Sequence, residues 1–439
     1  MIEALLSQIQ NPNTQWVLAG TMLLGIASGV LGSFSLLRKQ SLIGDAMAHA
    51  ALPGVCIAFL LYGSKSLLWF LVGAALAGLL AAWFIQVIIN HSRIKEDSAL
   101  GLVLSVFFGF GIVLLTFIQH NGAGNQSGLD DFIFGQAASM VGSDVQLISI
   151  IASILLLLTA VFFKEFKLIT FDPQFAKGIG IPTTFFNGLL LTLIVSAVVI
   201  GLQTVGVVLM AAMLITPAIS ARYWTENLNQ MIVIAGFIGG ISGMTGTLLS
   251  TITKGMATGP LIIVAATVMF LISLIFAPRR GLLAKGIKQL SLRKKTAIEQ
   301  TLLSFYDLTE LGNSAAFSEQ DLLEKRTLAP SLNKYALRVL KNRHLIIETN
   351  VDQQWTLTEK GLEAAYEVVL QQRLYEMYLM HEMELAQLQI SSRDDVILKE
   401  LPSDIKDRLF KLLKVHERTP LLLPKSANLG QGSVFTSEL

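Results

Sequence analysis

An aspartate and a histidine lie four residues apart in the apolar stretch GDAMAHAALPGV, residues 44–55. On a helix, residues i and i+4 share one face, so Asp45 and His49 would present a carboxylate and an imidazole to the same point. Such a pair can bind one divalent cation, and it suits Mn²⁺, Fe²⁺ or Zn²⁺ better than Ca²⁺ or Mg²⁺, which prefer oxygen ligands alone. The alternative is a structural Asp–His hydrogen bond that locks two helices together, and the spacing alone leaves both interpretations open.

The sequence around this pair is typical of a membrane protein. The chain has 439 residues, of which 53% are hydrophobic and only 15% charged, whereas a soluble protein carries about a quarter charged residues. From residue 16 to residue 278 apolar runs follow one another, each long enough to cross roughly 30 Å of hydrocarbon. Ionisable groups are rare at membrane depth and usually line a pathway. We therefore predict an all-α polytopic membrane domain over residues 1–285.

The apolar runs predict about nine membrane-spanning helices. The sixth and the seventh are separated only by GLQT, residues 201–204, so eight spans are the alternative count. The expected spans are Trp16–Leu37, Leu42–Tyr62, Leu67–Asn90, Ala99–Ile118, Val145–Phe163, Phe185–Ile200, Val205–Ala221, Met231–Thr251 and Pro260–Ala277.

The basic residues predict how these spans are oriented. Lys and Arg concentrate in alternate connections, whereas the opposite connections hold only Lys65 and Lys254. Because basic connections stay in the cytoplasm, the N-terminus is expected outside and the C-terminus inside, in a bacterial plasma (inner) membrane crossed many times. The single cysteine, Cys56, excludes an intrachain disulfide. The basic residues assigned to the cytoplasm are Arg38, Lys39, Arg93, Lys95, Lys164, Lys167, Lys177, Arg222, Arg279 and Arg280.

Further motifs follow the Asp–His stretch in order: EDSALGLVLSVFFGFGIVLL, DDFIFGQ, FDPQFAKGIGIP, GLQTVGVVLMAAMLITPAISA and GMATGPLII. Together with SLIGDAMAHAALPGVCIAFLL they closely resemble the permease subunits of bacterial ABC importers for manganese, zinc and iron, the ABC-3 family. The resemblance implies that Asp45 and His49 form the transported-metal site. It also implies that an extracytoplasmic metal-binding protein delivers the cation, which passes between two permease protomers, the second being the same or a related chain. The metal is cargo, and no permanently bound cofactor is expected.

Two other segments of the membrane domain are candidates for a role in transport. Gln203, in LQTVG, is a candidate to offer a side-chain oxygen to the path, the alternative being a helix-end or inter-helix hydrogen bond. No phosphate-binding GxxxxGK[ST] loop occurs, so the chain is not expected to be an enzyme and needs a separate ABC ATPase. The segment 171–182 resembles the coupling segment of ABC permeases and includes Asp172, with Ala176 and Gly180 at the spacing of a short helix and turn. The alternative is a plain amphipathic loop.

The region from residue 291 onward has the charged composition of a soluble domain. Residues 291–400 predict helix, turn, helix, a hairpin of LIIET with QWTLT, and a final helix, which is the order of a winged helix-turn-helix. Ser331 and Thr358 are expected to cap helices. This region resembles the N-terminal half of the diphtheria-toxin-repressor-like metalloregulators, including LTEKGLEAA and RLYEMYL. Residues 401–439 predict a short helix followed by a flexible tail.

The second resemblance makes DNA a candidate partner. The helix over residues 331–342 would place Lys334, Arg338 and Lys341 at phosphates and Ser331 and Asn333 at base edges. The alternatives are a solvated helix face or a docking module.

Metal sensing by this region is a separate question. Gln372 replaces the metal-binding histidine that the metalloregulators carry before RLxE, which leaves Glu376 and His381 as candidate regulatory ligands.

The sequence bears on three classes of function. A membrane-tethered, metal-linked DNA-binding regulator needs fewer spans, although it is compatible with transport in one fused chain. A secondary transporter would show inverted repeats and more intramembrane carboxylates. The sequence favours the permease subunit of an ABC importer for a divalent transition metal.

Overall fold

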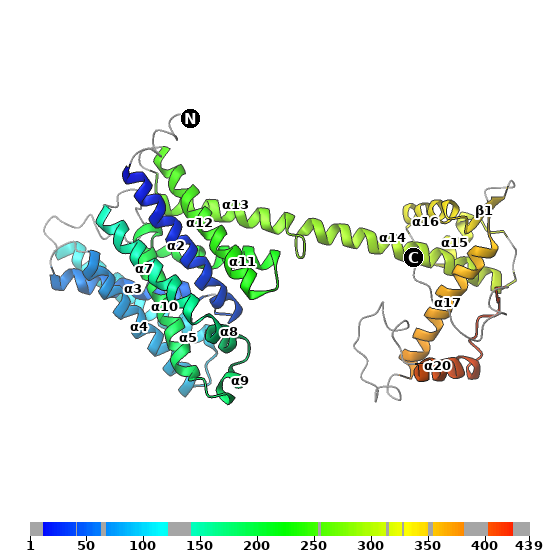
Figure 1. Cartoon of the computed structure of the whole chain (residues 1–439), viewed down its shortest axis with the longest axis horizontal. Helices are drawn as coiled ribbons and strands as arrows, with labels where there is room; N and C mark the ends of the chain where they lie inside the picture. The colour runs from blue at the N-terminus through cyan, green and yellow to red at the C-terminus, as the bar shows by residue number, and fades with distance from the viewer. Residues whose placement is uncertain are drawn as a thin grey trace. The chain divides into compact units, whose positions relative to one another are not determined.

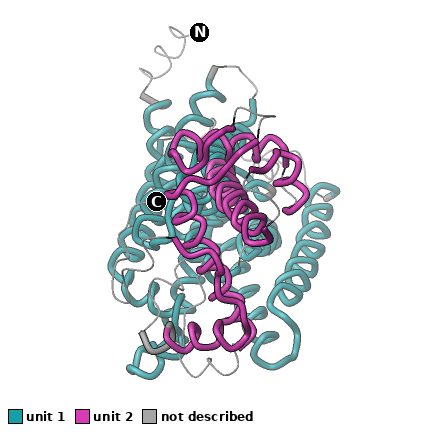
Figure 2. The backbone as a smooth tube through the Cα atoms, turned by 90° about the vertical axis from the view of Figure 1, so that its right-hand side faces the viewer, with its two compact units in different colours: residues 1–285 teal, residues 286–439 magenta. Residues whose placement is uncertain are grey.

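The computed structural model describes residues 12–40, 42–62, 67–121, 142–252, 256–312, 316–326, 329–349, 354–381 and 403–424. The chain forms two compact units, residues 1–285 and residues 286–439, which are coloured teal and magenta in Figure 2. The motif DDFIFGQ, residues 130–136, and the predicted tail from residue 425 lie outside the described residues.

The first unit is a bundle of helices (Figure 1). Within the described residues, eight helices are long and apolar enough to cross a membrane, as a polytopic permease requires. Each overlaps one of the nine predicted spans; α11, at the predicted seventh span, is not among the eight. The helices are α2 (Pro12–Leu37), α3 (Ile43–Tyr62), α4 (Leu67–His91), α5 (Glu96–Asn121), α7 (Gly142–Val161), α8 (Phe163–Phe171), α9 (Pro173–Gly178), α10 (Thr183–Val205), α11 (Val207–Trp224), α12 (Leu228–Ile252) and α13 (Thr258–Phe276).

One glycine separates α10 from α11. Gly206 has φ +91° and ψ 162°, a backbone conformation that residues with a Cβ rarely adopt. Its N–H donates to the Leu202 carbonyl at 2.9 Å, which closes α10, and α11 begins at the next residue. The predicted sixth and seventh spans are therefore two separate helices with a sharp break between them.

Small residues let the helices around the Asp–His stretch pack closely. A Cβ on Gly54 of α3 would lie 2.1 Å from the carbonyl oxygen of Gly73 in α4, so the two backbones touch there. A Cβ on Gly44 would lie 2.9 Å from the Leu214 side chain of α11. The first half of α3 is consequently buried, with Met47, Ala48 and Ala51 fully inaccessible. This packing fixes the helix that carries Asp45 and His49.

The second unit contains a helical core and one β-hairpin. Its elements are α14 (Leu282–Glu310, in this unit from residue 286), α15 (Glu319–Lys325), α16 (Pro330–Asn342), β1 (Ile346–Thr349), β2 (Gln354–Leu357), α17 (Glu359–Met380) and α20 (Ser403–Val415). The strands are antiparallel and Ile346 lies opposite Leu357, which confirms the predicted hairpin.

The two predicted helix caps have different outcomes. Thr358 caps α17, since its hydroxyl accepts a hydrogen bond from the Gly361 N–H at 2.9 Å. The prediction for Ser331 is wrong, because α16 begins one residue earlier, at Pro330, with Ala329 in the cap position and no side-chain cap. Proline suits the first helical position, where its missing N–H has no intrahelical partner to lose.

Candidate functional site

The predicted Asp–His pair lies in the first two turns of α3. Asp45 Oδ1 and His49 Nε2 are 3.4 Å apart, so the helix does place both groups at one point. That separation is long for a hydrogen bond, whose usual length is about 2.7–3.2 Å. It does fit two ligand atoms that each lie about 2.1 Å from a tetrahedrally coordinated ion. Asp45 also lies in the first helical turn, where the helix dipole favours a negative charge.

The other face of the imidazole is held by packing. His49 meets the ring of Phe108 from α5 edge to face, with 4.7 Å between ring centroids. Its Nδ1 is buried and has no hydrogen-bond partner among the described residues. Buried polar atoms are usually paired, so an imidazole with spare bonding capacity is unusual in a purely structural role. The side chains of His49 and Asp45 remain 17% and 36% exposed, which leaves an approach to the pair.

Pro53 adds a backbone acceptor beside this pair. A proline inside a helix lacks the N–H that would bond the carbonyl four residues earlier. In α3 that carbonyl belongs to His49. His49 therefore carries both an imidazole and a carbonyl that lacks its usual helical donor.

The described residues contain no group of three or more His, Cys, Asp or Glu side chains that could hold a metal ion. Within this part of the chain, Asp45 and His49 are therefore an incomplete ligand set, weaker than the four ligands of a structural zinc site. Gln203 lies in the last turn of α10, and its side chain lies outside the described residues. Its predicted contribution to the path stays a prediction.

The three predicted coupling residues define a short helix between α8 and α10. Asp172 caps α9, since its Oδ1 accepts a hydrogen bond from the Phe175 N–H at 2.9 Å. Ala176 is fully buried, and its carbonyl accepts from the Ile181 N–H at 3.0 Å. Gly180 has φ +87°, which lets the chain turn back after the helix.

Sequence reasoning missed the apolar side chains of this segment. Phe171, Phe175 and Ile179 are each more than half exposed, at 57%, 56% and 55%. Their spacing of four residues was the available signal. Because they lie outside the candidate membrane spans, lipid tails do not account for their exposure.

In the second unit, the predicted DNA-contacting residues do not all share one face. Ser331, Lys334, Arg338 and Lys341 are exposed on α16. Asn333 is fully buried, and its Oδ1 accepts a hydrogen bond from Thr301 Oγ1 at 3.3 Å. The interpretation of Asn333 as a base-reading residue is therefore corrected, because its side chain faces the core. Lys341 forms an ion pair with Glu348 of β1.

The two predicted regulatory ligands, Glu376 and His381, make separate sets of contacts. Glu376 accepts hydrogen bonds from Gln372 Nε2 at 3.0 Å and from Arg418 Nη1 at 3.3 Å. His381 Nδ1 lies 3.2 Å from the Met377 carbonyl, and its ring lies 5.5 Å from the ring of His416. The carboxylate thus already has a cationic partner.

Comparison with known proteins places the membrane unit in a family. The model of the ABC 3 transport family matches residues 10–277. The chain is 59% identical over 436 residues to the manganese transport system membrane protein MntC of Bacillus subtilis (strain 168), covering 99% of both chains.

Other relatives match about two thirds of this chain. The zinc transport system membrane protein TroC of Treponema pallidum (strain Nichols) is 43% identical over 282 residues, 64% of this chain and 95% of that one. The solved structure of PsaBC from Streptococcus pneumoniae in complex with Fab covers 64% of this chain and 98% of the matched one, at 34% identity and a TM-score of 0.57. The chain belongs to the ABC 3 transport family.

Proposed function

We propose that this chain is the membrane-spanning permease subunit of an ABC importer for a divalent transition metal. The observation that carries the proposal is the Asp45–His49 pair, with ligand atoms 3.4 Å apart on the buried first half of α3. Mn²⁺, Zn²⁺ and Fe²⁺ all accept a carboxylate and an imidazole. The full-length similarity to a protein named for manganese transport favours Mn²⁺ as the cargo.

An incomplete ligand set suits transport. An ion that crosses the membrane has to be bound well enough to lose water and weakly enough to leave. Two ligands from this chain bind the ion weakly enough for it to leave. A second permease protomer would contribute its own pair of ligands, so that the ion is bound well enough to lose water. The ion would arrive from an extracytoplasmic metal-binding protein and leave toward the cytoplasm.

The energy would come from a separate ATPase that docks at α9. The exposed side chains of Phe171, Phe175 and Ile179 offer an apolar contact for a groove of that subunit. Asp172 and Gly180 fix the start and the end of the helix, so the segment can move as one body.

We also propose that the second unit is a cytoplasmic winged helix-turn-helix. The order α14, α15, α16, β1, β2, α17 supports this interpretation. Ser331, Lys334, Arg338 and Lys341 would face DNA, and Glu376 with His381 would be the regulatory metal ligands. In the alternative function, this unit makes the chain a membrane-tethered regulator, alone or fused with transport.

The test is cellular uptake of radioactive manganese, zinc and iron by the chain co-expressed with its ATPase, wild type beside His49→Ala. We expect uptake of one metal to disappear in the variant while its amount in the membrane stays unchanged. His91→Ala is the matched control, since His91 is an exposed histidine at the end of α4. Equal uptake of all three metals by wild type and His49→Ala would contradict the metal-path role.

A further inference from the structure

Arg38 joins the two ends of the coupling segment. It follows α2 directly, yet its guanidinium reaches residues more than a hundred positions away. Nε donates to Thr170 Oγ1 at 3.3 Å, and Nη2 donates to Asn187 Oδ1 at 2.8 Å. Thr170 precedes α9 and Asn187 follows it, so one side chain holds both flanks of the helix proposed to dock the ATPase.

The turn that carries Arg38 is fixed. Lys39 has φ +62°, and the Gln40 N–H donates to the Ser35 carbonyl at 3.0 Å, which closes the end of α2. The buried Ser35 hydroxyl donates back to the Gln40 carbonyl at 2.7 Å. The Ile43 N–H then donates to the same carbonyl at 3.2 Å, and Ile43 is the first residue of α3. These hydrogen bonds connect the turn that carries Arg38 to the start of α3.

The same turn also contacts the second helix that holds His49. The Gln40 amide donates to the carboxylate of Glu96, the first residue of α5. Further along, α5 supplies Phe108 against the His49 ring. Two cavities, of about 210 Å³ and 320 Å³, flank Arg38, and both are lined by Gln40 and Asn187. The arrangement leaves room for these side chains to change position.

The charge of Arg38 makes this placement costly. Burial lowers the pKa of its guanidinium to about 10, although the nearby Glu96 charge acts in the opposite direction. Arg38 is thus still a cation at neutral pH, and both of its direct partners are neutral oxygens. A partly buried cation that is held by neutral acceptors adds little to the stability of the fold. Such a contact suits a role in which it has to form and break.

We propose that Arg38 is a positioning residue that transmits movement of α9 to the metal-binding turn of α3. This role of Arg38 rests on the proposed function, because the movement originates in an ATPase docked at α9. When that subunit shifts α9, the flanks at Thr170 and Asn187 shift with it. Arg38 carries the shift through the fixed turn to Asp45 and His49. The planar guanidinium is needed because it reaches two acceptors at once, which a lysine ammonium does less well.

The experiment measures manganese uptake and ATP hydrolysis in the same proteoliposomes, with the chain reconstituted beside its ATPase and binding protein. For Arg38→Ala we expect ATP hydrolysis to continue while manganese uptake per ATP falls about tenfold, within the usual range of coupling between sites. Arg38→Lys should recover part of the ratio. Lys39→Gln is the matched control, since it removes an exposed cation from the same turn and should leave the ratio unchanged.

A second variant separates a transmitting role from a structural one. Asn187→Ala removes one acceptor and should lower uptake per ATP in the same direction. In the double variant the two effects should not add, because both act through one contact. If Arg38→Ala does not reach the membrane, Asn187→Ala alone decides.

Three outcomes would count against these ideas. A wild-type ratio in Arg38→Ala or, failing its insertion, in Asn187→Ala would overturn the role of Arg38. Parallel losses of hydrolysis and uptake would do the same, since they indicate a structural defect. A wild-type chain that imports none of the three metals would overturn the proposed function first, and the role of Arg38 with it.

Discussion

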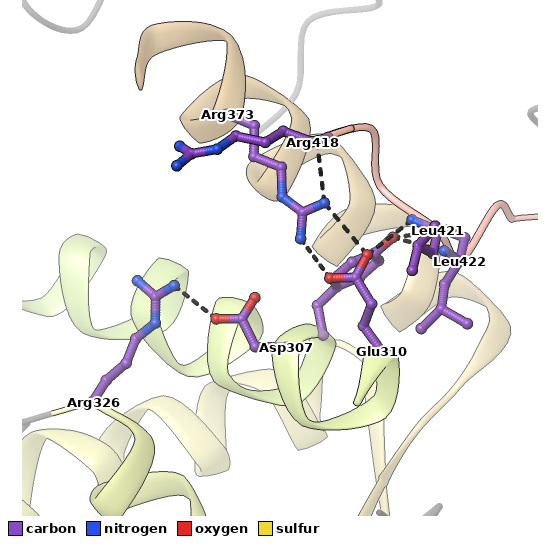
Figure 3. A network of polar contacts seen from close by, with 8 residues as sticks. Asp307, Glu310, Arg326, Arg373, Arg418, Leu421 and Leu422 are labelled. Atoms are coloured by element: carbon purple, nitrogen blue, oxygen red, sulfur yellow. Dashed lines mark hydrogen bonds and ion pairs between the residues drawn. The ribbon is translucent and has the colours of Figure 1, made fainter. Parts of the chain in front are cut away.

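Two functional candidates of the membrane unit are paired less completely than a largely buried carboxylate of the second unit. In the membrane unit, His49 keeps a buried nitrogen without a hydrogen-bond partner among the described residues, and Arg38 donates to the neutral oxygens of Thr170 and Asn187. In the second unit, Glu310 accepts two hydrogen bonds from Arg373 and one from the Leu421 N–H (Figure 3). Arg373 also donates to the Arg418 carbonyl.

This difference indicates where each charge acts. Groups with unused bonding capacity in an apolar setting can bind a passing ion or exchange partners during a cycle. Groups that are fully paired inside a packed core hold segments together instead. The network of Figure 3 fastens the stretch after α20 to α14 and α17. Charged residues of the membrane unit are therefore the stronger functional candidates.

The largest effect should come from the charge of the transport pair. Asp45→Asn keeps the shape of the side chain but removes the anionic ligand. Because even changes in the surroundings of metal ligands cost about 10–100-fold, we expect manganese uptake to fall by about 100-fold or more. Asp97→Asn, at an exposed aspartate in the first turn of α5, should transport normally. Normal manganese uptake by Asp45→Asn would contradict a transport role for this charge of the membrane unit.

The next largest effect should come from the ion pair between Glu310 and Arg373 in the second unit. Glu310→Gln leaves the Arg373 guanidinium, which is 19% exposed, without its anion. Removing one partner of such a pair should destabilise the second unit by about 2–3 kcal/mol, seen as faster hydrogen exchange in α17 of the intact chain. Manganese uptake per ATP should stay unchanged. Loss of uptake with normal exchange would show that this network also serves transport.

An exposed pair provides the control for that variant. Lys295 and Glu299 lie 3.9 Å apart, and their side chains are 65% and 42% exposed. Solvent screens such pairs, so Glu299→Gln should change stability by less than ~0.5 kcal/mol. A similar effect of both substitutions would indicate that burial does not distinguish the two pairs.

Local sequence predicted the features that depend on local physics. Apolar runs matched to the bilayer thickness gave helices at all nine expected spans, and the i, i+4 spacing brought Asp45 to His49. The cap at Thr358 and the β-hairpin also depend on neighbouring residues alone.

Long-range packing set the features that the sequence did not predict. Arg38 was interpreted only as a marker of orientation, because its partners lie 132 and 149 residues away. Asn333 carries a polar side chain on a helix with basic residues, yet the helix turns it toward Thr301 in the core. The helical period places residues on a face, but only the neighbouring elements decide which face is buried.

A smaller effect than that of Glu310→Gln tests the hydrogen bonds between Tyr306 and Leu422. Tyr306 OH donates to the Leu422 carbonyl and accepts from the Leu422 N–H, both at 3.0 Å. Tyr306→Phe should destabilise the second unit by about 1 kcal/mol, because it removes this pair of bonds. The measurement is thermal unfolding of the full chain in detergent. Tyr366→Phe is the control, since Tyr366 is also partly buried but has no hydrogen bond through its phenol within the described residues.

The same tyrosine predicts a pH dependence. Burial raises the pKa of Tyr306 from 10.0 to about 12, with the nearby Glu310 acting in the same direction and the hydrogen bond from the Leu422 N–H acting against it. Between these two pKa values the unfolded chain releases a proton that the folded chain retains, so stability falls as pH rises. The wild-type unfolding temperature should therefore decrease more steeply from pH 10 to pH 12 than that of Tyr306→Phe. Equal slopes of unfolding temperature against pH would mean that the Tyr306 phenol is solvated and that its contact with Leu422 is open.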